Sequence, residues 1–392
     1  MEDFLKQEQQ PKKLNVKKII ILIVIAILVI FVLVVTYLYT ENERFRKWVD
    51  NEILPKEVRQ GNTVEIELNQ ENVQIFAVDK YIVTLQEKTL NFYNNLGTKV
   101  GTVSVEINNA ITDTAGKNFI IAEKNGKKAY VISDRNLVWE TETEGEILQI
   151  EINENGYVGI VTSDISYKNI VTLYDSLGKQ LIRTYIATAK VSDISISKNS
   201  QHLAIAEVDT SGVLIQSTIK IISIETAKKD PNNSVEYTYN ADINKLILNI
   251  EYQNKERLVC MYQDTIDVIE NKQSKTIASL KEKNITFASI ELNDNLVKIE
   301  ENTLGDYDYK SIVYIKNITN EKYKKYSVEK VAKDIYTSQD VIGLNLGTEL
   351  HIINRNGWLI KKYVANQEIN NIVISNKIAG VIYRNKIEII DI

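Results

Sequence analysis

The sequence has few of the residues that enzymes most often use for catalysis or metal binding. Its 392 residues include one cysteine and two histidines. Cys260 has no partner in the chain, so no intrachain disulfide can form. Two histidines and one cysteine cannot supply the closely spaced ligands of a zinc site. The 15 glycines are scattered at expected turns, without a phosphate-binding loop. We therefore expect no catalytic residues, no cofactor and no metal.

Clustered positive charge is also missing. Lys and Arg total 47 against 52 Asp and Glu, which gives a formal charge of −5. Because binding to a phosphate backbone needs grouped Lys and Arg, we expect no nucleic-acid partner.

The few candidate chemical residues occupy unremarkable places. His202 follows a turn at the start of an expected strand, His351 lies within ELHIIN, and Cys260 lies within RLVCMYQ. We expect structural or surface roles for the histidines and a core position for the cysteine. An acidic run at residues 300–308 could offer oxygen ligands to Ca²⁺, but its spacing fits no calcium loop, and we expect a solvated surface loop.

One long apolar run dominates the N-terminal region. Residues 19–39 carry no charge, and a helix of that length covers roughly 30 Å, the thickness of a bilayer core. A buried core helix is the alternative, but such helices rarely stay apolar on every face. The run therefore predicts a transmembrane helix.

The flanking charges predict its orientation. The preceding tail has five lysines, whereas the three basic residues just after the run are diluted by Glu41 and Glu43. The positive-inside rule then places residues 1–18 in the cytoplasm. A cleaved signal peptide is the alternative, but it would end in small residues, and here the exit reads TYLYTENERF. We expect an uncleaved single-pass anchor in the cell membrane.

Residues 40–61 read as a juxtamembrane helix and linker, and residues 62–392 read as an extracytoplasmic all-β domain. Short alternating or continuous β-branched runs are separated by Asn, Asp, Gly and Lys. The clearest unit, 191–225, holds SDISIS, HLAIAEVD and STIKIISIE, and SVEYTYN follows as a fourth strand.

Comparable units recur every 40 to 45 residues or so, which is typical of propeller blades. We predict an eight-bladed β-propeller of four-stranded blades, with seven blades as the alternative. The last segment supplies only three strands, so we expect the strand at 62–69 to pair with them and close the ring.

KNSQHLAIAEVD and NENGYVGIVTSD resemble the turn and second strand of WD-repeat, quinoprotein-like and TolB-like propellers. The layout of one membrane helix followed by a degenerate propeller resembles an uncharacterised bacterial family that carries a domain-of-unknown-function label. The resemblance covers residues 62–392 and implies architecture without any catalytic residue. The adjacent cysteine pair of quinoprotein dehydrogenases cannot exist here, because the chain has a single cysteine.

Long polar loops between second and third strands are expected at 163–168, 208–216 and 300–309, on one rim of the ring. Since function often lies in loops on a rigid scaffold, we predict contact residues there: Tyr167, Asp209, Asp306, Tyr307 and Tyr309.

Three functions remain open. The first is a membrane-tethered binding or scaffolding module for a protein or cell-envelope component. The second is a carboxylate-dependent glycan hydrolase or lyase, which needs acidic groups close together in a cleft. A membrane sensor is third, weakened by the short cytoplasmic tail.

Overall fold

The structure, a computed structural model, describes residues 16–54, 56–68, 73–230, 233–282, 284–302 and 310–392. The chain divides into two compact units, Met1–Lys56 and Glu57–Ile392. Each unit is described by itself.

The first unit is helical. Helix α1 (Val16–Glu41) contains one continuous apolar stretch, long enough to cross a membrane and buried nowhere inside the protein. Its length and composition suit a membrane anchor or a signal sequence. Helix α2 (Glu43–Trp48) begins after Asn42, whose side chain accepts a hydrogen bond from the Phe45 N–H (3.0 Å). A π-helical turn, η1 (Val49–Ile53), follows it.

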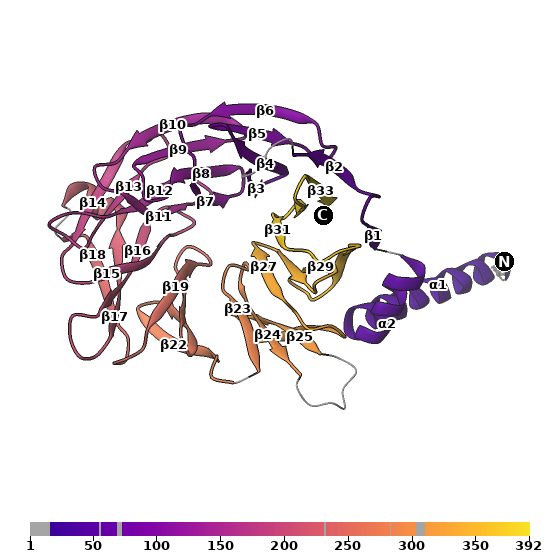
Figure 1. Cartoon of the computed structure of the whole chain (residues 1–392). Coiled ribbons are helices and arrows are strands. Elements are labelled where there is room, and N and C mark those ends of the chain that lie inside the picture. Colours follow the sequence, from indigo (N-terminus) through magenta and orange to yellow (C-terminus); the bar gives the residue numbers. More distant parts are fainter. Residues whose placement is uncertain (1–15, 55, 69–72, 231–232, 283, 303–309) are drawn as a thin grey trace, which may run out of the picture. The chain divides into compact units, whose positions relative to one another are not determined.

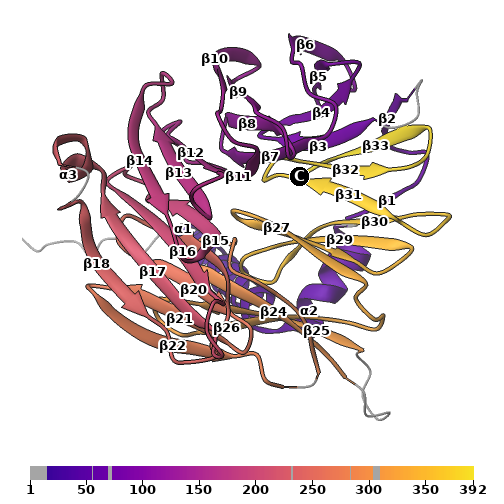
Figure 2. The ribbon, with the colours of Figure 1, turned by 60° about the vertical axis from the view of Figure 1, so that its left-hand side comes forward.

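The second unit is a ring of eight small sheets, so the eight-bladed propeller is confirmed (Figures 1 and 2). Strands are consecutive within blades 1 to 7. Blade 1 contains β3 (Gln74–Val78), β4 (Tyr81–Gln86), β5 (Thr89–Tyr93) and β6 (Lys99–Ser104), and blade 2 contains β7 (Ala110–Ala115), β8 (Asn118–Glu123), β9 (Lys128–Ser133) and β10 (Asn136–Glu142). Blade 3 contains β11 (Ile147–Ile152), β12 (Val158–Thr162), β13 (Asn169–Tyr174) and β14 (Gln180–Ile186), and blade 4 contains β15 (Lys190–Ile196), β16 (His202–Asp209), β17 (Gln216–Ser223) and β18 (Val235–Asn240).

Blades 5 to 8 complete the ring. Blade 5 contains β19 (Ile247–Tyr252), β20 (Leu258–Tyr262), β21 (Thr265–Glu270) and β22 (Gln273–Ser279), and blade 6 contains β23 (Ile285–Ser289), β24 (Asn295–Glu301), β25 (Ser311–Asn317) and β26 (Tyr323–Val328). Blade 7 contains β27 (Asp334–Ser338), β28 (Val341–Asn345), β29 (Glu349–Asn354) and β30 (Leu359–Val364), and blade 8 contains β31 (Asn371–Ile374), β32 (Ile378–Ile382) and β33 (Lys386–Asp391).

The core lies between the blades. The second strands β12 and β28 are buried along their whole length, because each blade packs against a neighbour on both faces. Among the described residues, one apolar cluster fills each interface between successive blades. The core is therefore a circle of similar contacts, as expected for a repeat architecture.

Two N-terminal strands join blades formed by the end of the chain. Strand β2 (Val64–Glu67) pairs antiparallel with β33 and completes blade 8. Strand β1 (Glu57–Arg59) runs parallel to β30 as a fifth strand of blade 7. These pairings cover two edges that would otherwise expose unpaired N–H and C=O groups.

One expected strand is shorter than the sequence suggests. Residues 217–225 read as a continuous strand, but β17 ends at Ser223 and helix α3 (Ile224–Lys229) follows. The Ser223 hydroxyl accepts a hydrogen bond from the Thr226 N–H (3.3 Å) and caps this helix. The apolar side chain of Ile224 extends the strand-like pattern of the sequence, but Ile224 is a buried residue of helix α3.

Candidate functional site

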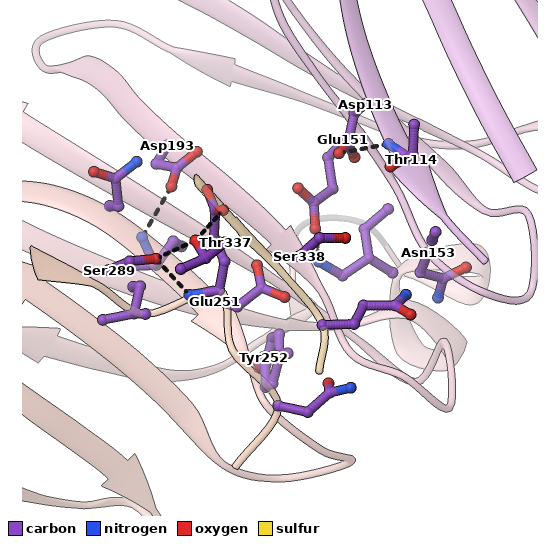
Figure 3. A pocket seen from close by; sticks show the side chains of 18 of the residues that line it. Asp113, Thr114, Glu151, Asn153, Asp193, Glu251, Tyr252, Ser289, Thr337 and Ser338 are labelled. Carbon is purple, nitrogen blue, oxygen red and sulfur yellow. Dashed lines mark hydrogen bonds between the residues drawn. The ribbon is translucent and has the colours of Figure 1, made fainter. Parts of the chain in front are cut away.

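A pocket of about 470 Å³ lies where the first strands of blades 2 to 7 approach one another (Figure 3). The first strand of each blade faces the propeller axis, and β7, β11, β15 and β19 contact one another in turn. The lining includes Asn153, Lys198 and Gln339 from turns between first and second strands. The pocket therefore lies toward the rim opposite the loops between second and third strands.

Most charged groups that line the pocket are carboxylates. The first strands of blades 2 to 5 each supply one: Asp113, Glu151, Asp193 and Glu251. Figure 3 labels all four side chains. Glu291 follows β23, and Glu154 lies in the turn after β11. Among the described lining residues Lys198 is the only Lys or Arg.

Three of these carboxylates connect neighbouring blades. Asp113 accepts a hydrogen bond from the Ile152 N–H (2.6 Å) of the next blade. Glu151 accepts one from Ile196 N–H (3.2 Å). Asp193 in turn accepts one from Ile250 N–H (2.9 Å). Each carboxylate thus satisfies an N–H on the inner edge of the following sheet, which would otherwise stay unpaired.

Among the described residues, the side chains of Glu251 and Glu291 accept no hydrogen bond from a backbone N–H of the following blade. Within the described part of the chain, no hydrogen bond or ion pair of the Glu251 side chain is present. Glu291 accepts one hydrogen bond, from the Thr337 hydroxyl (2.9 Å). Glu251 and Glu291, together with the exposed Glu154, are therefore the carboxylates available to a ligand.

Burial and mutual repulsion raise the pKa values of these groups. Loss of hydration raises the pKa of Asp193 and that of Asp113 to about 6. Burial, together with the nearby Asp113, Glu291 and Asp193 carboxylates, raises the pKa of Glu251 to about 8. The pKa of Glu151 is raised well above its ordinary value for the same reasons. At neutral pH the pocket is therefore negative and still holds protons.

The arrangement does not suit a metal ion. Among the described residues no three His, Cys, Asp or Glu side chains lie together as a metal site requires. Lys198 reaches across to Asn293 Oδ1 (2.6 Å), away from an ion pair with the axial carboxylates. Carboxylates spread over several blades suit a longer cationic group with several donors.

The two predicted contact residues that the structure describes, Tyr167 and Asp209, do not line this pocket. Tyr167 lies in the loop after β12, and its ring packs against Tyr185 with centroids 4.9 Å apart. Asp209 ends β16 and accepts a hydrogen bond from Ser211 N–H (2.8 Å), and such bonds from Ser211 lower its pKa. Asp306, Tyr307 and Tyr309 lie outside the described residues.

The cysteine and one of the two histidines are buried, and both histidines contact neighbouring side chains. Cys260 is fully buried between blades 4 and 5. His351 is buried, with Nδ1 2.9 Å from the Tyr326 hydroxyl and Nε2 3.1 Å from Glu349. His202 is partly exposed and its Nε2 lies 3.2 Å from Glu236.

The glycan hydrolase or lyase hypothesis required Asp and Glu around the central channel, but sequence reasoning named none of these carboxylates, although a signal was present. Residues 147–151 read ILQIE and residues 247–251 read ILNIE, so the two glutamates occupy the same place in their blades. Both strands also carry a bulge at the same point, after Ile147 and after Ile247. Alignment of the first strands would have placed acidic residues at one level of the ring.

The fold and the pocket define an eight-bladed β-propeller with an acidic axial cavity. Over residues 55–392 the chain belongs to a family of unknown function, DUF5711. No curated protein matches the sequence. Dihydro-heme d1 dehydrogenase NirN in complex with DHE is similar in fold, with a TM-score of 0.52, 9% identity, and 90% of this chain and 83% of that chain covered. BamB from Moraxella catarrhalis has a TM-score of 0.46 and 12% identity, with 84% of this chain and 99% of that chain covered.

Proposed function

We propose that this protein is a membrane-tethered binding module whose propeller lies outside the cytoplasm. Its ligand is a positively charged segment of a protein or of a cell-envelope component, bound at the axial pocket. The observation that carries the proposal is the axial cavity of about 470 Å³, with Glu251 unpaired among the described residues and facing it. The anchor is α1, and the lysine-rich tail before it supports a cytoplasmic N-terminus.

Proton release accompanies binding in this mechanism. Because burial raises the pKa of Glu251 to about 8, this carboxyl is mostly protonated at pH 7. An ammonium or guanidinium group favours the ionised carboxylate, so it displaces the proton. Affinity therefore rises between pH 6 and pH 9 and weakens with added salt.

A titration of the full chain in detergent micelles with tetralysine tests this function. We expect binding at low salt that is at least about tenfold weaker in the double variant Glu251→Gln, Glu291→Gln, because two charge-assisted contacts are lost. The matched control is Glu225→Gln, Glu321→Gln, which removes two exposed carboxylates away from the axis. Tetraglutamate serves as the probe of opposite charge.

The proposal fails if the control and the axial variant lose the same affinity, because binding would then report only net charge. It also fails if tetralysine and tetraglutamate bind alike. Calorimetry in two buffers of different ionisation enthalpy measures the proton release directly.

The loop rim supplies a second proposed contact for a protein partner. Ile165 and Val213 are fully exposed at the tips of the loops after β12 and β16. Tyr167 and Asp209 lie in or beside the same two loops, and Asp306, Tyr307 and Tyr309 belong to the third loop predicted on this rim. Replacing both Ile165 and Val213 with Ser leaves tetralysine binding intact if the two surfaces act separately.

A carboxylate-dependent glycan hydrolase or lyase is the alternative function. It is favoured by one observation, namely that carboxyl groups with raised pKa values interact within one pocket. Release of reducing sugar from cell-envelope glycans by the full chain, abolished by Glu251→Gln, would support it.

A further inference from the structure

A second cavity, of about 260 Å³, lies between blades 4 and 5. Its apolar lining includes Leu258 and Ile269, which are both buried. His202 and Glu236 line it as well, and their side chains lie 3.2 Å apart (Nε2 to Oε2). Its volume is below the range of roughly 300–1,000 Å³ that suits drug-sized ligands, so it fits a fragment or a single side chain.

Tyr252 lies at the end of β19 and lines both this cavity and the axial pocket. The side chain is 3% exposed and packs in the cluster that joins blades 4 and 5. Within the described residues its hydroxyl has no hydrogen-bond partner, and the backbone N–H of this residue donates to Ser195 Oγ (3.0 Å). A hydroxyl without a protein partner is satisfied by water or by a ligand in the cavity.

Tyr252 and Glu236 both line the cavity. Burial raises the pKa of Tyr252, and the nearby Cys260 and Glu236 raise it further. Cys260 is sealed in the core, whereas the Glu236 side chain is 42% exposed. Ligand groups that enter between the blades therefore meet a phenol that can accept a hydrogen bond and a carboxylate that can only accept one.

The remaining charges at this cavity also matter. Glu256 and Glu270 line it, and Glu270 is paired with Arg257 (3.1 Å). Lys272 lies at the same cavity and is exposed. Glu236 in turn lies 3.2 Å from His202, and the three glutamates outnumber the one lysine among the residues that line the cavity.

We propose that this inter-blade cavity binds an amphipathic primary amine, with its apolar body on Leu258 and Ile269 and its ammonium group between Glu236 and the Tyr252 hydroxyl. The amine is either a free small molecule or a lysine side chain of a partner protein. This site shares Tyr252 with the axial pocket, but Glu236, Leu258 and Ile269 line only the inter-blade cavity, and the proposal does not depend on the proposed function.

The test is saturation-transfer NMR and calorimetry of the full chain in micelles. Benzylamine represents the free amine, Nα-acetyl-lysinamide represents the side chain, and benzyl alcohol and benzoate have a similar body without the ammonium group. We expect an amine to bind at millimolar or lower concentration and both controls to bind at least about tenfold more weakly. Whichever amine binds more tightly identifies the source.

Two variants locate the binding. Tyr252→Phe removes only the hydroxyl and weakens amine binding about fivefold, and Glu236→Gln weakens it about tenfold. The matched control is Tyr262→Phe, because the Tyr262 hydroxyl has no partner among the described residues either and Tyr262 does not line the cavity. An unchanged melting temperature shows that each variant is folded.

Three results overturn the proposal. These are no amine binding at 10 mM (roughly the weakest fragment affinity of interest), equal binding of benzoate, and an equal effect of the Tyr252 and Tyr262 substitutions. Tetralysine binding at the axis stays unchanged in Glu236→Gln, because Glu236 lines this cavity and does not line the axial pocket, and this keeps a failure here distinct from failure of the axial site.

Discussion

At the scale of single residues, Glu388 joins the two ends of the propeller. This carboxylate is fully buried on β33. Its Oε2 accepts hydrogen bonds from the hydroxyls of Thr63 (2.6 Å) and Tyr363 (2.9 Å), while Lys386 lies 2.7 Å from Oε1. Burial by itself would raise the pKa of Glu388, but the contacts with Lys386, Thr63, the Gly61 N–H and Tyr363 lower it overall.

We expect Glu388→Gln to lower the free energy of unfolding by about 2–4 kcal/mol, because it breaks a buried charged network. The control is Glu65→Gln, which removes the half-exposed second partner of Lys386 and should cost less than about 1 kcal/mol. Urea unfolding of the full chain measures both. Equal costs for the two variants would contradict the role given to Glu388.

The same comparison has a pH dependence. A carboxylate with a lowered folded-state pKa stabilises the protein above its unfolded pKa, and this contribution disappears as the pH falls through the folded pKa. The difference between the protein and Glu388→Gln should therefore shrink below about pH 4.

The contribution of Glu251 to stability should have the opposite pH dependence. Its folded-state pKa is raised to about 8, so its favourable contribution is complete below the unfolded pKa of about 4.3 and is lost as the pH rises through 8. Glu251→Gln should melt at about the same temperature as the protein at pH 5 and about 2–4 °C higher at pH 9. Parallel melting curves at both pH values would show that Glu251 is not buried with other carboxylates.

At the scale of elements, the turns between third and fourth strands position the blades. Gly178, in the turn between β13 and β14, has a φ of +82°, and an added Cβ would lie 2.8 Å from Trp139 Cδ2 of the preceding blade. Gly116, in the turn between β7 and β8, has a φ of +58° and open space around it. The two glycines share the backbone requirement, but only Gly178 also leaves room for a neighbouring ring.

Gly116→Ala should therefore cost about 1 kcal/mol, through backbone strain alone. Gly178→Ala should cost at least about 2 kcal/mol, because the indole must also move. The double variant Gly178→Ala, Trp139→Leu should lose less free energy of unfolding than the two single variants lose together. Additive costs, measured by urea unfolding, would contradict the packing of Trp139 on this turn.

The blades could be predicted from the sequence because their signals are local. Each blade has its own alternating strands and turn residues. Gly97 and Gly178 occupy the same turn in blades 1 and 3, and both have positive φ values. Helix α3 was missed because Ile224 continues the apolar pattern of β17 while Ser223 already caps a helix. Local pattern alone could not separate these two outcomes.

The axial pocket could not be predicted in the same way. Its carboxylates come from separate blades, for example Asp113 from β7 and Glu251 from β19, and they meet only when the ring closes. Their raised pKa values depend on that closure, since each group loses hydration and gains charged neighbours there. Attention to long loops led instead to Tyr167 and Asp209, which lie on the other rim.

At the scale of the whole molecule, the ring is closed without a covalent bond. Strand β2 comes from the start of the propeller and pairs with β33 from its end, with Ile66 opposite Ile387. Blade 8 therefore forms only when both ends of the unit are present, which makes its stability dependent on the closed ring. The proposed anchor, α1, precedes this strand in the chain.

We have proposed that α1 holds the propeller outside the cytoplasm. Labelling of single cysteines in spheroplasts with a membrane-impermeant maleimide tests it most directly, with Gln7→Cys in the tail and Ser166→Cys in the exposed loop after β12. Native Cys260 is buried and should not react in the folded protein. We expect Ser166→Cys to be labelled in intact spheroplasts and Gln7→Cys only after lysis. The reverse pattern would contradict the account.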